Sequence, residues 1–221
     1  MTIQPAPFAP DQKIVLVIGN STFPDPRNLE PYRAQIDFVV CTDGGTRNAL
    51  RYGFTPDVII GDFDSISTAD QKHFADTQTV MKRMPDQEQN DLEKAVLYLL
   101  QYNRNAFILA GFWGQREDQT LATISVMQKY GGQARFLLLT PGSRIFLLPA
   151  GQFQLPAFDG QTISLFGAPS ATGITTDGLR YPLNGESLTD GSRGLSNTAT
   201  HEKILIRLST GQILIVAMNP I

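Results

Sequence analysis

The sequence predicts a mostly parallel α/β domain followed by a small antiparallel β domain, with the boundary near residues 145–150. In the first part, short apolar runs alternate with helix-like stretches, which is typical of a parallel sheet covered by helices. In the last part, glycine and proline separate short apolar segments and no helical period is present, which is typical of antiparallel strands. A length of 221 residues suits two such small domains.

The apolar runs of the first part are short and rich in β-branched residues, as expected of strands that are buried on both faces. We expect these strands at residues 13–18, 36–41, 57–60, 106–110 and 136–140. The clearest helix is expected over residues 91–103, where apolar residues recur at i, i+3, i+4, i+7 and i+8. Asn90 can cap this helix, and Glu93 completes a capping-box signal. A second helix is expected over residues 118–130, where two glycines end it.

The last part of the chain shows four segments with strand composition. We expect strands at residues 162–166, 173–176, 203–208 and 212–216. A turn at Ser209-Thr210-Gly211 would join the last two strands as a hairpin.

Composition excludes several classes of partner. The formal net charge is −3 at pH 7 and the pI is near 5.4, so we expect neither nucleic acid nor a membrane surface as a partner. Cys41 is the only cysteine, which rules out an internal disulfide and fits a reducing compartment. No basic flank leads into an apolar stretch at the N-terminus, and the apolar runs are far shorter than the roughly 20 residues that cross a bilayer. We therefore expect a cytoplasmic protein.

Acidic residues and glycines follow three of the predicted strands. They are Asp43, Gly44 and Gly45 after residues 36–41, Asp62 and Asp64 after residues 57–60, and Asp118 with Arg116 after residues 106–110. Asp91 opens the predicted helix. Because ligands of open α/β sheets bind at the carboxyl ends of the strands, these residues are expected to share one site.

The chemistry of this set points to a magnesium–nucleotide site. In Asp62-Phe63-Asp64, an extended backbone would turn both carboxylates one way and Phe63 into the core. Two carboxylates about 4 Å apart repel by roughly 4 kcal/mol at an effective dielectric of 20, so several of them together favour a cation. Carboxylates plus substrate phosphates are the usual ligands of Mg²⁺. A phosphate loop with its lysine and a Gly-x-Gly-x-x-Gly fingerprint are both absent from the sequence.

Six motifs, spread over nearly the whole chain, carry a family resemblance. They are Asp43-Gly44-Gly45, Pro56-Asp57 followed by Gly61-Asp62-Phe63-Asp64-Ser65, Asp86-Gln87-Glu88-Gln89-Asn90-Asp91, Gly114-Gln115-Arg116-Glu117-Asp118-Gln119, Gly173 to Leu179, and Gly194-Leu195-Ser196-Asn197. Together they resemble the thiamin pyrophosphokinase (thiamin diphosphokinase) family. Asn90, Gln115 and Gln119 depart from the Thr, Gly and His that are usual there. A glutamine cannot act as a general base near neutral pH. A mechanism that depends on a titrating histidine at position 119 is therefore excluded.

The resemblance implies that residues 1–147 form a Rossmann-like α/β domain that binds ATP and Mg²⁺, and that residues 148–221 form a β-sandwich that binds thiamin and dimerises. It implies a homodimer with thiamin near the subunit interface. It also implies transfer of diphosphate from ATP to the thiamin hydroxyl, giving thiamin diphosphate and AMP. The expected metal ligands are Asp43, Asp62, Asp64 and Asp91.

The same resemblance suggests roles for the remaining site residues. Arg116 would bind the phosphates, and Asp118 would orient Arg116 or assist at the hydroxyl. The other nucleotide-side residues are Gly44, Gly45, Asn90 and Gln119, with Arg47 and Lys82 as weaker cationic candidates. Ser196 and Asn197 would hydrogen-bond the aminopyrimidine of thiamin.

Three alternatives remain open at this point. A pterin diphosphokinase would use the same acidic residues on another acceptor. A haloacid-dehalogenase-like phosphatase also carries Asp-x-Asp after a strand, with the first Asp as nucleophile. A non-catalytic thiamin- or nucleotide-binding module would follow if Gln115 and Gln119 mark lost activity.

Overall fold

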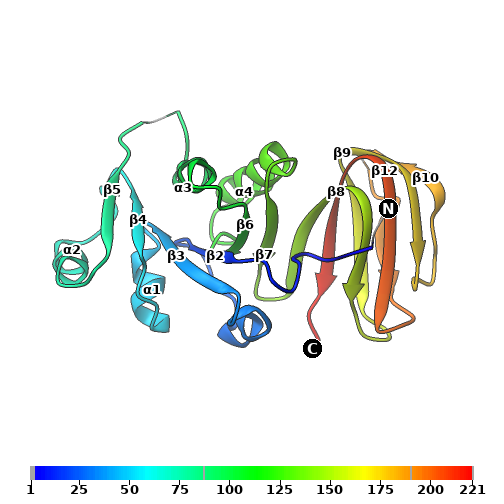
Figure 1. The fold of residues 1–221 in the computed structure, drawn as a ribbon, viewed down its shortest axis with the longest axis horizontal. Helices are drawn as coiled ribbons and strands as arrows, with labels where there is room; N and C mark the ends of the chain where they lie inside the picture. Colours follow the sequence, from blue (N-terminus) through cyan, green and yellow to red (C-terminus); the bar gives the residue numbers. More distant parts are fainter. Residues whose placement is uncertain (1–2, 87, 190, 221) are drawn as a thin grey trace. The chain divides into compact units, whose positions relative to one another are not determined.

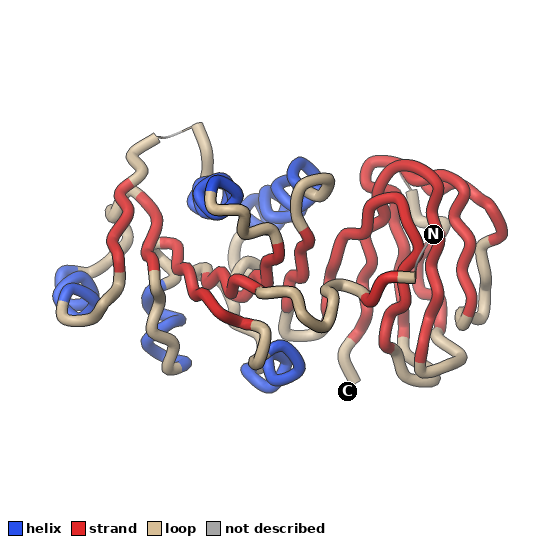
Figure 2. Tube along the Cα trace, viewed as in Figure 1, coloured by secondary structure: helices blue, strands red, loops and turns tan. Residues whose placement is uncertain are grey.

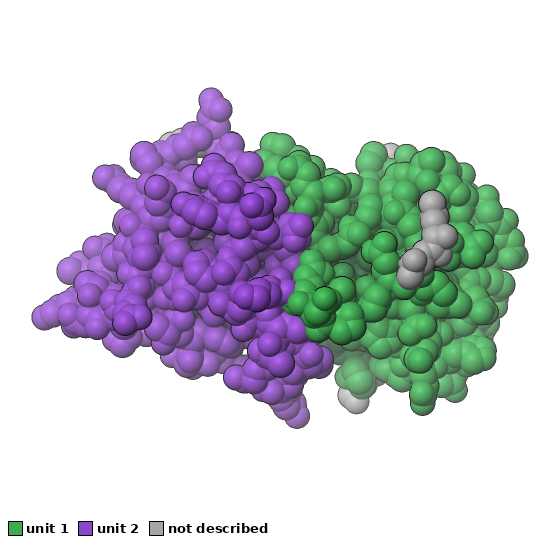
Figure 3. All heavy atoms as spheres, in the orientation of Figure 1, with its two compact units in different colours: residues 1–12, 127–137, 142–221 green, residues 13–126, 138–141 purple. Residues whose placement is uncertain are grey.

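The computed structural model describes residues 3–86, 88–189 and 191–220. The chain divides into two compact units (Figure 3). The α/β unit comprises residues 13–126 and 138–141, and the β unit comprises the described part of residues 1–12, 127–137 and 142–221. Helix α4 (Glu117–Tyr130) and strand β7 (Arg135–Leu139) contribute residues to both units.

Five strands build the sheet of the α/β unit, in the spatial order β6-β2-β3-β4-β5 (Figure 1). They are β2 (Ile14–Ile18), β3 (Ile36–Thr42), β4 (Val58–Gly61), β5 (Val80–Arg83) and β6 (Ala106–Ala110). Every neighbouring pair is parallel, so all five carboxyl ends lie along one edge of the sheet. Strands β2 and β6 are buried at every residue, as their continuous apolar sequences predict.

Helices cover both faces of this sheet (Figure 1). They are α1 (Thr46–Tyr52), α2 (Thr68–Ala75), α3 (Asp91–Gln101) and the 3₁₀ helix η1 (Pro26–Tyr32), together with the first part of α4. The apolar stripe of α3 packs against β3 and β4. Asn90 caps α3 as predicted, because its side-chain oxygen accepts a hydrogen bond from the Glu93 N–H at 2.9 Å.

The β unit is built from long antiparallel strands (Figure 2). They are β8 (Ser143–Pro156), β9 (Thr162–Asp177), β10 (Asn184–Leu188), β11 (Gly194–Thr198) and β12 (Lys203–Met218), with the short β1 (Gln4–Pro5) beside β8. Strand β12 pairs along its length with β8 on one side and β9 on the other. Strands β10 and β11 add to the far edge of β9.

Two expectations for this unit are wrong. Residues 203–208 and 212–216 do not form a hairpin, because both belong to β12 and share the partners β8 and β9. The predicted turn is instead a shift of register between Leu208 and Gln212. Gly211 sits there at φ +81°, and a Cβ on it would lie 2.1 Å from the Ser170 carbonyl oxygen. Residues 162–166 and 173–176 likewise belong to the single strand β9.

The predicted fold class is confirmed: a mostly parallel α/β unit accompanies an antiparallel β unit. The predicted domain boundary after residue 147 falls within β8, and it stays a prediction. Among the described residues, none of the helices is both long and apolar enough to span a membrane.

Candidate active site

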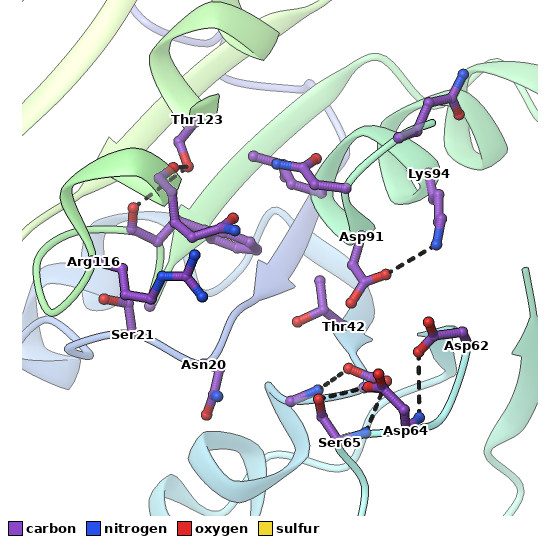
Figure 4. Close-up of a pocket in the computed structure, with 18 of the residues that line it drawn as sticks. Asn20, Ser21, Thr42, Asp62, Asp64, Ser65, Asp91, Lys94, Arg116 and Thr123 are labelled. Carbon is purple, nitrogen blue, oxygen red and sulfur yellow. Dashed lines mark hydrogen bonds and ion pairs between the residues drawn. The ribbon is translucent and has the colours of Figure 1, made fainter. Parts of the chain in front are cut away.

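A pocket of about 510 Å³ opens at the carboxyl ends of the parallel strands (Figure 4). Its walls come from the loops that follow β2, β3, β4 and β6, from the start of α3 and from the start of α4. The chain runs from β2 outward to β5 and then returns to place β6 on the other side of β2. Such a reversal of strand order leaves a crevice, and this is where ligands of open α/β sheets bind. The volume lies within the range of small-molecule sites.

Three of the four predicted metal ligands meet at one point of this pocket. Asp43, Asp62 and Asp64 each offer a carboxylate oxygen, and these oxygens all lie within 4.8 Å of one another. Asp43 is buried, Asp62 is half-buried and Asp64 is exposed, so the cluster runs from the floor of the pocket to its mouth. A set of hard oxygen donors that keeps one side open to solvent suits a divalent ion that also binds phosphate.

Asp43 is also the residue that shapes the loop after β4. Its carboxylate accepts hydrogen bonds from the backbone N–H groups of Gly44, of Phe63 at 3.1 Å and of Ser65 at 3.5 Å. A Cβ on Gly61 would lie 2.9 Å from the Asp43 side chain, so glycine allows the two strand ends to approach this closely.

The expected extended backbone at residues 62–64 is wrong. Phe63 has φ +68°, a left-handed conformation, and its side chain is half-buried instead of anchored in the core. Ile66 is the buried apolar residue of this loop. The bend brings the two carboxylates together by curving the chain around the Asp43 carboxylate, which accepts from the N–H groups on both sides of Asp64.

Asp91 reaches the same pocket from the N-terminus of α3. Burial and the negative charge of Asp43 raise the pKa of Asp91 to about 6, although the ammonium group of Lys94 acts in the opposite direction. All four predicted metal ligands therefore line one pocket, and their role as ligands stays a prediction.

The wall formed by the start of α4 carries the cationic group. The Arg116 guanidinium donates to both carboxylate oxygens of Asp118, through Nε at 3.0 Å and through Nη2. This ion pair lowers the pKa of Asp118, so Asp118 is suited to orient Arg116 and not to remove a proton. Arg116 and Gln119 line the pocket, whereas Asp118 is not among the lining residues. Gln115 also lines it, at φ +65°, where glycine would be unstrained.

Of the remaining residues predicted for nucleotide binding, some line the pocket and others do not. Gly44 and Asn90 line the pocket. Gly45 precedes α1, where a Cβ would lie 2.1 Å from the Ile18 carbonyl oxygen, so its role is close packing. Arg47 and Lys82 are exposed and do not line the pocket.

In the β unit, Ser196 and Asn197 differ from one another. Ser196 is exposed and has φ +57°. Asn197 is buried, and its amide accepts from the Tyr181 N–H at 3.1 Å and donates to the Tyr181 carbonyl at 2.7 Å. Both ends of the Asn197 amide are thus occupied by backbone. Gln87 of the motif at residues 86–91 lies outside the described residues.

Sequence reasoning missed several lining residues with polar side chains, among them Asn20, Ser21, Lys94 and Thr123. Asn20 and Ser21 follow the fully buried β2, so the rule that placed Asp43 also applied to them. The Asn48 amide holds this loop by donating to the carbonyls of Gly19 at 2.7 Å and Ser21 at 2.9 Å. The sequence gives no sign that Lys94 is buried, because this residue lies off the apolar stripe of the predicted helix.

Two family models match the chain. Residues 29–137 match the thiamin pyrophosphokinase catalytic domain, and residues 152–213 match the thiamin pyrophosphokinase vitamin B1 binding domain. Thiamine pyrophosphokinase 3 of Oryza sativa subsp. japonica is 29% identical in an alignment that covers 83% of this chain and 78% of that protein. Thiamine pyrophosphokinase of Bacillus subtilis (strain 168) is 24% identical, with 86% of this chain and 94% of that protein covered.

Solved structures share the fold. The crystal structure of thiamine pyrophosphokinase from Bacillus subtilis has a TM-score of 0.79 at 21% identity, over 95% of this chain and 100% of that one. Thiamin pyrophosphokinase from Candida albicans has a TM-score of 0.79 at 20% identity, over 95% of this chain and 90% of that one. At these identities the similarity concerns the fold.

Proposed function

Since this chain belongs to the thiamin pyrophosphokinase family, its function is that of a thiamin diphosphokinase, and we propose that it binds ATP in the pocket of the α/β unit. The reaction moves the diphosphate group of ATP to the hydroxyl group of thiamin and yields thiamin diphosphate and AMP. The observation that carries the choice of pocket is the meeting of Asp43, Asp62 and Asp64 within 4.8 Å at the carboxyl ends of the strands.

The donor set fits Mg²⁺. Asp64 is exposed at the mouth of the pocket, Asp62 and Asp91 are half-buried, and Asp43 is buried. These four carboxylates would hold the ion together with phosphate oxygens of ATP. A bound Mg²⁺ supplies neutralisation of phosphate charge and a fixed orientation of the phosphate chain.

The chain's own residues would perform the remaining tasks. Arg116 neutralises phosphate oxygens from the wall opposite the acids, and Asp118 holds its guanidinium in place. The thiamin hydroxyl oxygen attacks the β-phosphorus in line, the bond to the α–β bridging oxygen breaks, and AMP leaves with that oxygen. The hydroxyl proton passes to solvent, because Gln119 cannot accept it and the Arg116 ion pair lowers the pKa of Asp118.

Thiamin binding is assigned to the β unit, where the vitamin B1 binding model matches. Ser196 is the better candidate for a direct hydrogen bond to the aminopyrimidine, because its side chain is exposed while that of Asn197 is bound to Tyr181. Ser196→Ala should raise the KM for thiamin more than the KM for ATP. Equal rises for both substrates would count against this division of roles. A homodimer and a cytoplasmic location remain predictions.

The direct test mixes the protein with ATP, Mg²⁺ and thiamin and follows the products by chromatography. AMP and thiamin diphosphate should form in equal amounts. A pterin alcohol, offered as the control acceptor, should give no AMP. Release of ADP or free phosphate with no thiamin diphosphate, or trapping of an aspartyl-phosphate, would contradict the proposal.

A further inference from the structure

Lys94 is a buried cation that the proposed chemistry has not used. It is 2% exposed, it lies in the first turns of α3, and it lines the pocket. Leu92, Val96 and Leu99 form the apolar stripe of this helix, and Lys94 lies about 200° round the helix from Leu92, at 3.6 residues per turn. Its burial is therefore not that of a core position on the stripe.

Two physical costs accompany a lysine at this place. A buried ammonium group loses its hydration, and this loss is expensive unless the charge is paired. The N-terminal end of a helix also disfavours positive charge, because the helix dipole is positive there. Within the described part of the chain, the Lys94 ammonium has one hydrogen-bonding partner, Oδ1 of Asp91 at 3.4 Å. An ordinary surface pair at i, i+3 contributes too little to offset both costs.

The position of Asp91 explains why a lysine is buried at residue 94. Asp91 projects from the same helix into the pocket, where the negative charge of Asp43 acts on its carboxylate. A cation beside the Asp91 carboxylate offsets this repulsion. The Lys94 ammonium holds Oδ1 from the helix side (Figure 4), and the other oxygen of Asp91 is left for the pocket.

We propose that Lys94 is a positioning residue for the diphosphate transfer, which fixes the Asp91 carboxylate toward the divalent cation. This inference rests on the proposed function, because it takes the acidic pocket as the cation site. Lys94 acts through Asp91 in this account, and it does not contact the reacting phosphorus.

The test measures cation affinity directly, with Mn²⁺ as the probe and electron paramagnetic resonance of free Mn²⁺ as the readout. Lys94→Met should raise the Mn²⁺ dissociation constant by about 10-fold or more, as loss of a residue that orients a metal ligand typically does. Asp91→Asn should have a similar effect. In the double variant, Lys94→Met should add less than about 2-fold to the effect of Asp91→Asn, because both changes remove one interaction.

Matched controls separate this role from a general loss of structure. Lys72→Met changes an exposed lysine of α2 and should leave Mn²⁺ binding unchanged. Thermal melting in EDTA reports whether each variant is folded, and Lys94→Gln serves as the second variant if Met at this position disturbs the fold.

The Mn²⁺-binding measurements decide whether Lys94 positions Asp91. Wild-type Mn²⁺ affinity in folded Lys94→Met or Lys94→Gln, or losses that multiply in the double variant, would overturn it and leave the proposed function standing. A wild-type protein that binds Mn²⁺ no better than Asp62→Asn would overturn the cation site itself, and this inference with it. A non-additive loss at unchanged melting temperature supports the role.

Discussion

Replacing Asp43 by Asn sets two effects of opposite sign against each other in the metal-free protein. Asn keeps one acceptor oxygen, which can hold the Gly44 N–H bond, but the Phe63 N–H bond at 3.1 Å loses its charged acceptor, and a hydrogen bond to a charged group contributes about 1.5–3 kcal/mol. The Ser65 contact at 3.5 Å is long and adds little. Against this loss stands the removal of one negative charge from a cluster of three.

The magnitude of the second effect follows from the spacing of the oxygens. Two unit charges at the 4.8 Å limit of the cluster repel by roughly 3.5 kcal/mol at an effective dielectric of 20, and by roughly 0.9 kcal/mol in bulk water. Asp43 has two such neighbours, Asp62 and Asp64, so the relief lies between about 2 and 7 kcal/mol. Over most of its range this relief equals or exceeds the energy of the lost hydrogen bond. In EDTA, Asp43→Asn should therefore melt at or above the wild-type temperature.

The assay is thermal melting with EDTA and with excess Mg²⁺. Mg²⁺ should raise the melting temperature of the wild type and raise that of Asp43→Asn much less, because binding to the native state stabilises it. Asp159→Asn, an exposed aspartate of the β unit, is the control and should keep the full Mg²⁺ effect. A variant that melts well below wild type in EDTA, with an undiminished Mg²⁺ effect, would refute the electrostatic reasoning.

Further predictions follow from the same site and from the β unit. Asp62→Asn or Asp64→Asn should lower kcat by about 10²-fold or more with the fold intact, and near-normal turnover in either would refute the metal assignment. The raised pKa of Asp91 implies a stability contribution that is present below pH 3.8 and is lost as pH rises through about 6. In EDTA the melting temperature of wild type relative to that of Asp91→Asn should therefore fall by about 2–4 °C between pH 4 and pH 7.5, since Asp91 is half-exposed and its charge is screened; a difference independent of pH would contradict this. Gln115→Gly should be about 1 kcal/mol more stable to urea than Gln115→Ala, because only glycine is unstrained at φ +65°; equal stability would argue against strain. Asn197→Ala should lower the free energy of unfolding by about 1–3 kcal/mol, through loss of buried backbone contacts, and an unchanged urea midpoint would exclude that structural role.

Sequence patterns predicted best the elements in which the local signals agree with the tertiary packing. Strands β2 and β6 are apolar throughout, and α3 has both an apolar stripe and a capping Asn90, so local signals and tertiary packing agree. Strand β5 was missed because its residues are mostly exposed at the edge of the sheet and carry no alternation. The length of β12 was missed because Gly211 resembles a turn, whereas pairing with strands on both sides continues past it.

The sequence was sufficient to predict which loops come together to form the site. The rule that strands of a parallel sheet share one carboxyl edge places Asp43, Asp62 and Asp64 together from the sequence alone. The gradient of burial among them was not predictable, because it depends on the left-handed turn at Phe63. The burial of Lys94 could not be predicted from the sequence for a similar reason, because it comes from tertiary surroundings and not from the period of the helix.

The central claim is that four carboxylates, from the loops after β3 and β4 and from the start of α3, hold one divalent cation beside the phosphates of ATP. Its most direct test is a crystal structure of the protein with Mn²⁺ and a non-hydrolysable ATP analogue, with the ion located by anomalous scattering. The claim predicts an anomalous peak within about 2.5 Å of carboxylate oxygens of Asp62 and Asp64 and of phosphate oxygens of the analogue. A nucleotide bound in the pocket with no ion near any of the four carboxylates would contradict it.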